Sequence, residues 1–201
     1  IRDVLKNQLN EDLVQTYMEF FDKEIENLNN SPKVIEKVLI DNLCELINQE
    51  LTKHQMYSIL LQMNAVTLAD GTISKREEEL VEHIRANFKI SKEEFANIKE
   101  FVLAQKREDF NGKNILLIDS LEKGEEANYQ HLKRDGVNGF IAIIYFAATN
   151  SAFIKKLGKT EVFLNGIALP NNHIKAFSEG SSIRGKFETV YYSDLVSVYQ
   201  S

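Results

Sequence analysis

Glycine is distributed very unevenly along this chain, and this feature constrains the possible folds more than any other. Residues 1–110 contain a single glycine, Gly71, whereas residues 111–201 contain the other eight. Glycine destabilises helix interiors and supplies the positive φ angles of tight turns. The sequence therefore predicts a helical first part and a second part of short strands joined by turns.

Charge changes at the same place. Residues 1–110 carry 21 acidic and 14 basic side chains, a net of −7, and residues 111–201 carry 9 and 10, a net of +1. The polar stretch KREDFNGKN lies at the transition. We therefore expect an α+β protein, with a helical domain over residues 1–110 and a small all-β domain over residues 111–201.

The overall composition excludes several classes of protein. A net charge of −6 argues against broad binding to nucleic acid or to acidic membranes. No apolar run approaches the roughly 18 residues of a membrane span, and no signal peptide is visible. The single cysteine, Cys44, allows no internal disulfide, so we expect a cytoplasmic protein. Because the chain begins with Ile, we also expect it to be part of a longer protein.

Apolar residues in the first half recur at the three- and four-residue spacing of helices. Ser31 and Pro32 are typical of a helix start, and MYSILLQMNAVTLA (56–69) is apolar on nearly every side. A helix of the latter kind is normally central in a bundle. We expect Asp70-Gly71 to end it, with Gly71 in the left-handed conformation.

Two capping boxes follow this central segment. Ser74 with Glu77, and Ser91 with Glu94, have the S-x-x-E spacing in which the serine accepts a backbone N–H and the glutamate reaches back. We therefore expect a helix to begin directly after each serine.

The stretch LADGTISKREEE (68–79) has a second interpretation, as an acidic loop that holds a metal ion. A calcium EF-hand starting at Asp70 would need acidic or amide ligands at alternate positions and a glutamate at the twelfth, where Val81 stands. That pattern fails, but Asp70 and Glu77 could still converge on a cation. The turn and the metal site both remain open from the sequence.

A run of glutamates continues along the expected helix: Glu77 is followed by Glu78, Glu79 and Glu82. Such a run is most often a solvated helix face. The sharper alternative is a docking face for a cationic partner.

LADGTISKREEELVEHI on a helical background resembles the TerB-like tellurite-resistance family over roughly residues 30–106. The residues that carry the resemblance are Ala69, Asp70, Gly71, Ile73, Ser74 and Glu77. It implies an all-helical fold. It also implies a divalent metal such as calcium, magnesium or zinc, held in this sequence by Asp70 and Glu77.

The second half has the residue pattern of short β-strands. Runs rich in β-branched and aromatic residues occur at 115–119, 140–146, 152–157, 161–166, 173–177 and 189–194. Turn signals such as Asn165-Gly166 lie between them, which favours a small sandwich or barrel. The polar segment SLEKGEEANYQHLKRDG is expected to be a loop or a short helix.

LGKTEVFLNGIALPNNHIKAFSEGSSIRG resembles the C-terminal part of forkhead-associated domains, which read phosphothreonine through loops at one end. The matching residues are Leu157, Gly158, Thr160, Phe163, Asn165, Gly166, Gly180, Ile183 and Gly185. The expected Gly-Arg and Ser-x-x-His are missing, and Glu161 replaces the ligand-reading asparagine. The resemblance therefore implies the fold, with phosphate reading lost.

Other motifs predict no chemistry. GSSIRGKF (180–187) lacks the Ser or Thr that a nucleotide-binding loop needs after lysine, and it is interpreted as a hairpin turn. No two of the four histidines have a metal-ligand spacing, and each is expected at the surface or half-buried. Since no nucleophile–base pair is visible locally, we expect a non-catalytic chain.

The helical and β parts together, ending in GSSIRGKFETVYYSDLV, resemble the N-terminal region of ATP-binding cassette (ABC) transporter ATPases from Bacteroidota. This implies a regulatory or interaction region whose partner is an adjoining ABC ATPase domain of the same chain. The alternative is a free-standing, metal-binding stress protein of the tellurite-resistance type. Neither hypothesis involves nucleic acid or insertion of this segment into a membrane.

Overall fold

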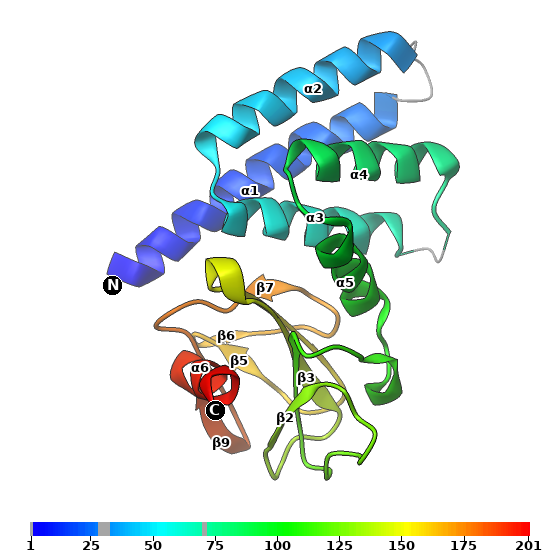
Figure 1. Ribbon diagram of the computed structural model, residues 1–201. Coiled ribbons are helices and arrows are strands. Elements are labelled where there is room, and N and C mark those ends of the chain that lie inside the picture. The colour runs from blue at the N-terminus through cyan, green and yellow to red at the C-terminus, as the bar shows by residue number, and fades with distance from the viewer. Residues whose placement is uncertain (1, 28–32, 70–71) are drawn as a thin grey trace. The chain divides into compact units, whose positions relative to one another are not determined.

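The computed structural model describes residues 2–27, 33–69 and 72–201 (Figure 1). The chain divides into two compact units, Ile1–Leu103 and Ala104–Ser201, here called the helical unit and the β unit. The boundary lies before the predicted one at residue 110 because the intervening residues bond to the β unit. The carbonyl of Ala104 accepts a hydrogen bond from Lys155 Nζ (2.7 Å), and Arg107 Nε donates to Asp119 (2.7 Å).

Five α-helices make up the described part of the helical unit, as the spacing of apolar residues predicts. They are α1 (Arg2–Asn27), α2 (Lys33–Glu50), α3 (Lys53–Thr67), α4 (Lys75–Asn87) and α5 (Lys92–Leu103). α3 packs against α1, α4 and α5, and α2 packs against α4. The predicted helix start at Ser31 and Pro32 lies outside the described residues.

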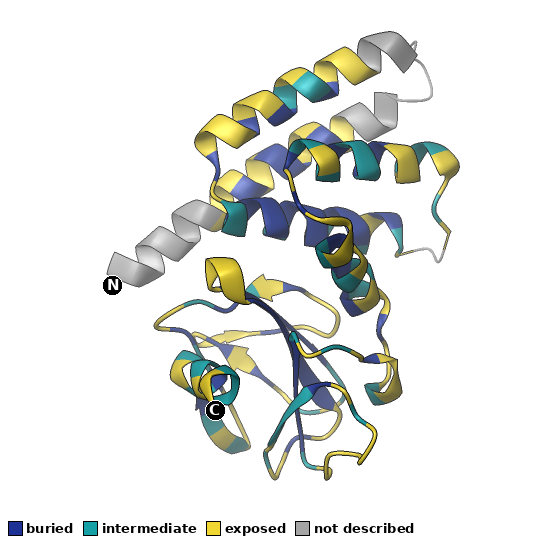
Figure 2. Cartoon of the chain, in the orientation of Figure 1, coloured by how far each residue is buried: buried dark blue, intermediate teal, exposed yellow. Residues whose placement is uncertain are grey.

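The central helix is α3, which Figure 2 shows as buried along most of its length. Ile59, Leu60 and Leu61 are fully buried. Thr52 caps its first turn in a capping box with Gln55, whose side chain accepts the Thr52 N–H (2.9 Å). The helix ends at Thr67, earlier than the predicted stop, and Leu68 is its C-cap; Asp70 and Gly71 lie outside the described residues.

The β unit consists of two sheets. Its strands are β1 (Ile115–Asp119), β2 (Gln130–Lys133), β3 (Phe140–Phe146), β4 (Ser151–Leu157), β5 (Phe163–Leu164), β6 (Ile167–Ala168), β7 (Lys175–Ala176), β8 (Ser182–Gly185) and β9 (Phe187–Tyr191). One sheet has the order β2-β1-β3-β4-β7 and the other β6-β5-β8-β9. β1 and β2 pair in parallel, and all the other paired strands are antiparallel.

Both sheets contribute to one apolar core, so they form a sandwich. The core contains Ile118, Ile143 and Ile154 from the first sheet and Ile183 and Val190 from the second, all fully buried. The overall α+β class is therefore confirmed. GSSIRGKF, predicted as a hairpin turn, contains strand β8 and the first residue of β9, and the two strands pair as a hairpin connected at Lys186.

Several segments of the β unit differ from the prediction. The short strands β6 and β8 were not predicted. β2 lies within the stretch predicted as a loop or short helix; it is a polar edge strand without the apolar run that marks a buried strand. The predicted strand at 189–194 ends at Tyr191 and is followed by a helix, α6 (Tyr192–Gln200). Asp194 accepts the Tyr191 N–H (2.7 Å), and Leu195 enters the core at helical spacing with Val198 and Tyr199. The domain is therefore not purely β.

Candidate functional site

The N-terminus of α4 carries the predicted metal ligand Glu77. Ser74 is the N-cap of α4, and its hydroxyl accepts the Glu77 N–H (3.1 Å). The same hydroxyl donates to the Glu77 carboxylate (3.0 Å), so this carboxylate is already engaged within its own helix turn. The other predicted ligand, Asp70, lies outside the described residues together with Gly71.

The predicted interaction face continues along α4. Glu78 and Glu79 are exposed, whereas Glu82 is half-buried. Arg85 donates twice to Glu82, through Nε (2.9 Å) and Nη2 (2.7 Å), and these bonds lower the pKa of the Glu82 carboxyl. The arrangement leaves Glu78 and Glu79 as the accessible carboxylates of this face.

The second predicted cap connects two helices. The Ser91 hydroxyl accepts the Glu94 N–H (3.1 Å) at the start of α5. The Glu94 carboxylate also accepts a hydrogen bond from the Tyr57 hydroxyl of α3 (2.5 Å). Glu94 therefore helps to hold α5 against the central helix, a tertiary contact that the capping pattern does not reveal.

The described residues offer little for a metal ion. Within them, no group of three or more His, Cys, Asp and Glu side chains is placed to hold one. Ca²⁺ takes six to eight oxygen ligands, and Glu77 is the one predicted ligand that the structure describes. Among the described helices, moreover, none combines the length and apolar character needed to cross a bilayer.

In the β unit, Asn165 and Gly166 form the tight turn between β5 and β6. Both have positive φ, 51° and 81°, as a two-residue hairpin turn requires. The Asn165 side chain accepts the Ser182 N–H (3.0 Å), and its backbone N–H donates to the Ser182 carbonyl (3.0 Å). Asn165 therefore joins the turn to β8, and the Asn165-Gly166 pair has a structural role.

The connections that follow β1, β2, β4 and β8 lie at one end of the sandwich, here called the loop end. Three glycines with positive φ, Gly136, Gly139 and Gly158, allow these connections to touch backbone to backbone. A Cβ atom at Gly136 would lie 2.0 Å from the Lys186 carbonyl oxygen, and one at Gly139 would lie 2.1 Å from that of Leu157. Only glycine fits at such crossings.

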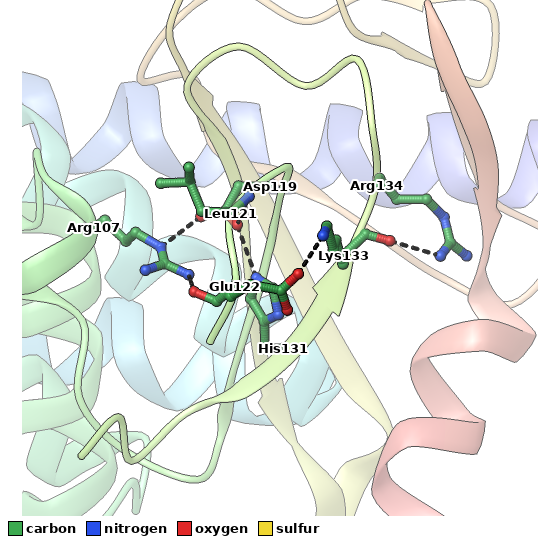
Figure 3. Close-up of polar contacts among 7 residues, drawn as sticks. All are labelled: Arg107, Asp119, Leu121, Glu122, His131, Lys133 and Arg134. Carbon is green, nitrogen blue, oxygen red and sulfur yellow. Dashed lines mark hydrogen bonds and ion pairs between the residues drawn. The ribbon is translucent and has the colours of Figure 1, made fainter. Parts of the chain in front are cut away.

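A largely buried polar cluster of Arg107, Asp119 and His131 joins chain segments at the loop end (Figure 3). The Asp119 carboxylate, 1% exposed, accepts from Arg107 Nε (2.7 Å), from His131 Nε2 (2.8 Å) and from the Leu121 N–H (3.1 Å). Arg107 also donates to the Glu122 carbonyl (2.7 Å). Asp119 therefore joins the segment before β1, the turn after β1 and strand β2.

At the surface of this cluster, Lys133 donates to the Glu122 carboxylate. This contact lowers the pKa of the Glu122 carboxyl and raises the pKa of the Lys133 ammonium group. Arg134 Nη1 donates to the Lys133 carbonyl (3.1 Å). Since Lys133 and Glu122 are exposed, their pair contributes little to stability.

Two open pockets adjoin at the loop end and share Gly136. One, of about 590 Å³, is lined by residues that include Arg107, Asp119, Ser120 and Asn138. The other, of about 680 Å³, is lined by Gly136, Lys159, Thr160, Glu161, Phe163, Arg184, Gly185 and Lys186. Both are within the size range of small-molecule sites. We call the second one the cationic pocket, because three basic side chains and one acidic side chain line it.

The sequence did not predict the polar cluster or the cationic pocket at the loop end of the β unit. His131 is half-buried, as expected, but its bond to Asp119, 12 residues earlier in the chain, was not predicted. A parallel pairing of β1 with β2 places them together, and β2 was not predicted. The basic residues of the cationic pocket are spread over residues 159–186, with no local motif to mark them.

Comparison with protein families decides the identity of the helical unit. Residues 1–100 match the family described as Tellurite resistance protein TerB. The helical unit is a TerB domain. Comparison of the chain with curated proteins and with solved structures gives no match.

The TerB match covers the acidic residues of α4 but not the polar residues at the loop end of the β unit. Glu77, Glu78, Glu79 and Glu82 lie within the TerB domain. The Asp119 cluster and the cationic pocket lie after residue 100, in the β-rich region that follows the TerB domain. The family resemblance seen in the sequence is therefore confirmed for the helical unit.

Proposed function

We propose that this chain is a non-catalytic regulatory or interaction region of an ATP-binding protein of the ABC transporter class. The TerB domain is its docking unit. The β unit, as a forkhead-associated-like sandwich, positions the TerB domain against the nucleotide-binding domain. Support for the transporter setting comes from the resemblance of both halves of the sequence to the N-terminal regions of such ATPases.

One observation carries the docking proposal: Glu78 and Glu79 are consecutive, exposed residues near the start of α4, with Glu78 in its first turn. Across the described residues neither carboxylate has an ion-pair partner, in contrast to Glu82 with Arg85. Docking a basic surface there would therefore break no existing ion pair. The net charge of −7 over residues 1–110 would steer a cationic partner toward this domain.

The first experiment determines what the source gene encodes after Ser201. A nucleotide-binding loop and an ABC signature downstream would support the transporter setting. A stop codon directly after Ser201 would contradict it.

The second experiment reverses the charge of the docking face. The double variant Glu78→Lys/Glu79→Lys is compared with Glu19→Lys/Glu45→Lys, which changes the net charge equally at exposed positions of α1 and α2. Binding to the purified nucleotide-binding domain is measured by calorimetry, and its ATPase rate is measured with and without the chain. We expect the first variant to weaken binding about tenfold or more and the second to bind as the unaltered chain does. Equal behaviour of the two variants would contradict a docking role for α4.

The TerB family match favours a second candidate, a divalent-metal-binding stress protein of the tellurite-resistance type. Asp70 and Glu77 would supply carboxylate ligands. This hypothesis predicts heat on titration with Ca²⁺, Mg²⁺ or Zn²⁺ and a higher melting temperature, since a ligand that prefers the native state stabilises it. Asp70→Asn/Glu77→Gln should abolish both effects, and Glu19→Gln/Glu45→Gln should preserve them. No heat and no shift with any of the three metals would exclude it.

A further inference from the structure

The cationic pocket has basic groups that the fold itself does not use. Throughout the described chain, the side chains of Lys159, Arg184 and Lys186 make no hydrogen bond or ion pair, and all three are exposed. Glu161, the acidic residue of the lining, is exposed and equally unpaired within the described residues. The pocket therefore has a formal net charge of +2 and a single carboxylate acceptor.

The chain segments that line this pocket contact one another closely through their backbones. A Cβ atom at Gly185 would lie 2.6 Å from the Glu161 carbonyl oxygen, and one at Gly136 would lie 2.0 Å from that of Lys186. The three segments that line the pocket are thus in contact at positions that only glycine permits. A ligand would meet groups that are already assembled, which reduces the entropy lost on binding.

Hydrogen bonds also stabilise the loop that carries Lys159. The largely buried Lys156 donates from Nζ to the Thr160 carbonyl (3.0 Å) and to the Gly158 carbonyl (3.4 Å). The Thr160 hydroxyl accepts the Asn138 N–H. These bonds fix the backbone on both sides of Lys159, so its side chain extends from a rigid base.

The lining combines three kinds of group. Lys159, Arg184 and Lys186 suit a phosphate, since basic side chains form charge-assisted hydrogen bonds to its oxygens. Phe163, a residue that is 36% exposed, offers an aromatic surface on which a planar ring can stack. The Glu161 carboxylate can accept from a hydroxyl or amino group, whereas it would repel a bare anion placed beside it.

We propose that the cationic pocket binds a small organic phosphate that carries a planar ring and hydroxyl or amino donors, of the nucleoside-phosphate class. The phosphate contacts the basic side chains, the ring stacks on Phe163, and a donor of the ligand bonds to Glu161. A nucleoside monophosphate has a charge near −2 that matches the +2 of the pocket. This site is independent of the α4 docking face and of the proposed ATPase partner.

The test titrates the 201-residue chain with AMP, adenosine and inorganic phosphate by calorimetry. We expect AMP to bind at least about tenfold more tightly than either adenosine or phosphate, since each lacks one half of the contacts. Binding of AMP should weaken as salt is raised, because exposed charges are screened. Phosphate binding as tightly as AMP, or no binding of AMP, would overturn the proposal.

Three variants localise the binding. Arg184→Gln/Lys186→Gln should weaken AMP binding about tenfold or more, whereas Lys113→Gln/Lys123→Gln, with the same charge change at exposed positions that do not line the pocket, should leave it unchanged. Phe163→Leu should weaken AMP binding and leave phosphate binding unchanged. Equal effects of the two charge variants would show non-specific attraction and overturn the proposal. So would displacement of AMP by a phosphothreonine peptide that binds more tightly than AMP.

Discussion

The acidic face of α4 in the helical unit and the loop end of the β unit build their polar contacts in opposite ways. On α4, Ser74, Glu77 and Glu82 bond to residues three positions away, so one turn of helix contains each interaction. At the loop end of the β unit, Asp119 bonds to residues 12 positions before and after it, and Gly136 touches Lys186. The serine cap and the Glu82–Arg85 pair of α4 are therefore visible in neighbouring residues of the sequence, whereas the contacts at the loop end depend on chain crossings.

The largest loss of stability is expected at Gly136 of the loop end, where there is no room for a side chain. Gly136→Ala places a Cβ atom against the Lys186 carbonyl at a residue with φ of +93°, and should lower the free energy of unfolding by more than about 4 kcal/mol. Gly166→Ala also has positive φ but meets nothing within 4 Å, and should cost about 1 kcal/mol. Urea denaturation measures both. Similar losses would mean that the crossing does not constrain the fold.

The next largest loss of stability is expected in the buried polar cluster around Asp119. Asp119→Ala leaves Arg107 and His131 without their shared acceptor and should cost about 3 kcal/mol of unfolding free energy. Glu122→Gln removes the exposed contact to Lys133 and should have no measurable effect. Denaturation curves followed by circular dichroism compare the two. A harmless Asp119→Ala would contradict the role of Asp119 in joining three segments.

Lys155 provides a pH-dependent test of the β unit. Burial lowers the pKa of its ammonium group to about 8, from 10.5 in the unfolded chain, although Nζ donates to the Ala104 carbonyl. Between these values the unfolded state binds more protons, so this group makes the free energy of unfolding rise with pH from about 8 to 10.5.

The variant Lys155→Met should lack this rise, whereas Lys113→Met, at an exposed position, should retain it. Denaturation at a series of pH values between 7 and 10 measures both variants against the unaltered chain. An equal slope for all three proteins would show that Lys155 titrates normally in the folded state.

The smallest effect is expected in the helical unit, where the caps are local. Thr52→Ala removes the complete capping box of α3 and should cost about 1 kcal/mol. Ser74→Ala removes the cap of α4 and should cost less, since α4 is a more peripheral helix than α3 and its cap is exposed. Thermal unfolding compares the two variants. A larger loss for Ser74→Ala would reverse this order and indicate a tertiary role for the α4 turn.

Sequence reasoning succeeded where the signal was local and failed where it was not. The starts of α4 and α5 follow from a serine cap before an apolar periodicity, and β3 follows from a long apolar run. β2 was missed because an edge strand such as Gln130–Lys133 needs few apolar residues. α6 was missed because Tyr191 and Tyr192 favour strands, although Leu195 packs into the core at helical spacing.

The residue pattern was sufficient to indicate a helical part of the TerB type followed by a glycine-rich β part, because helix periodicity, caps and glycine content act through near neighbours. The contacts of Asp119 with Arg107 and His131, and the three separate segments that line the cationic pocket, follow from the tertiary structure alone. The physical reason is that strand pairing and backbone crossings join residues far apart in the chain. No local pattern of residue types encodes those contacts.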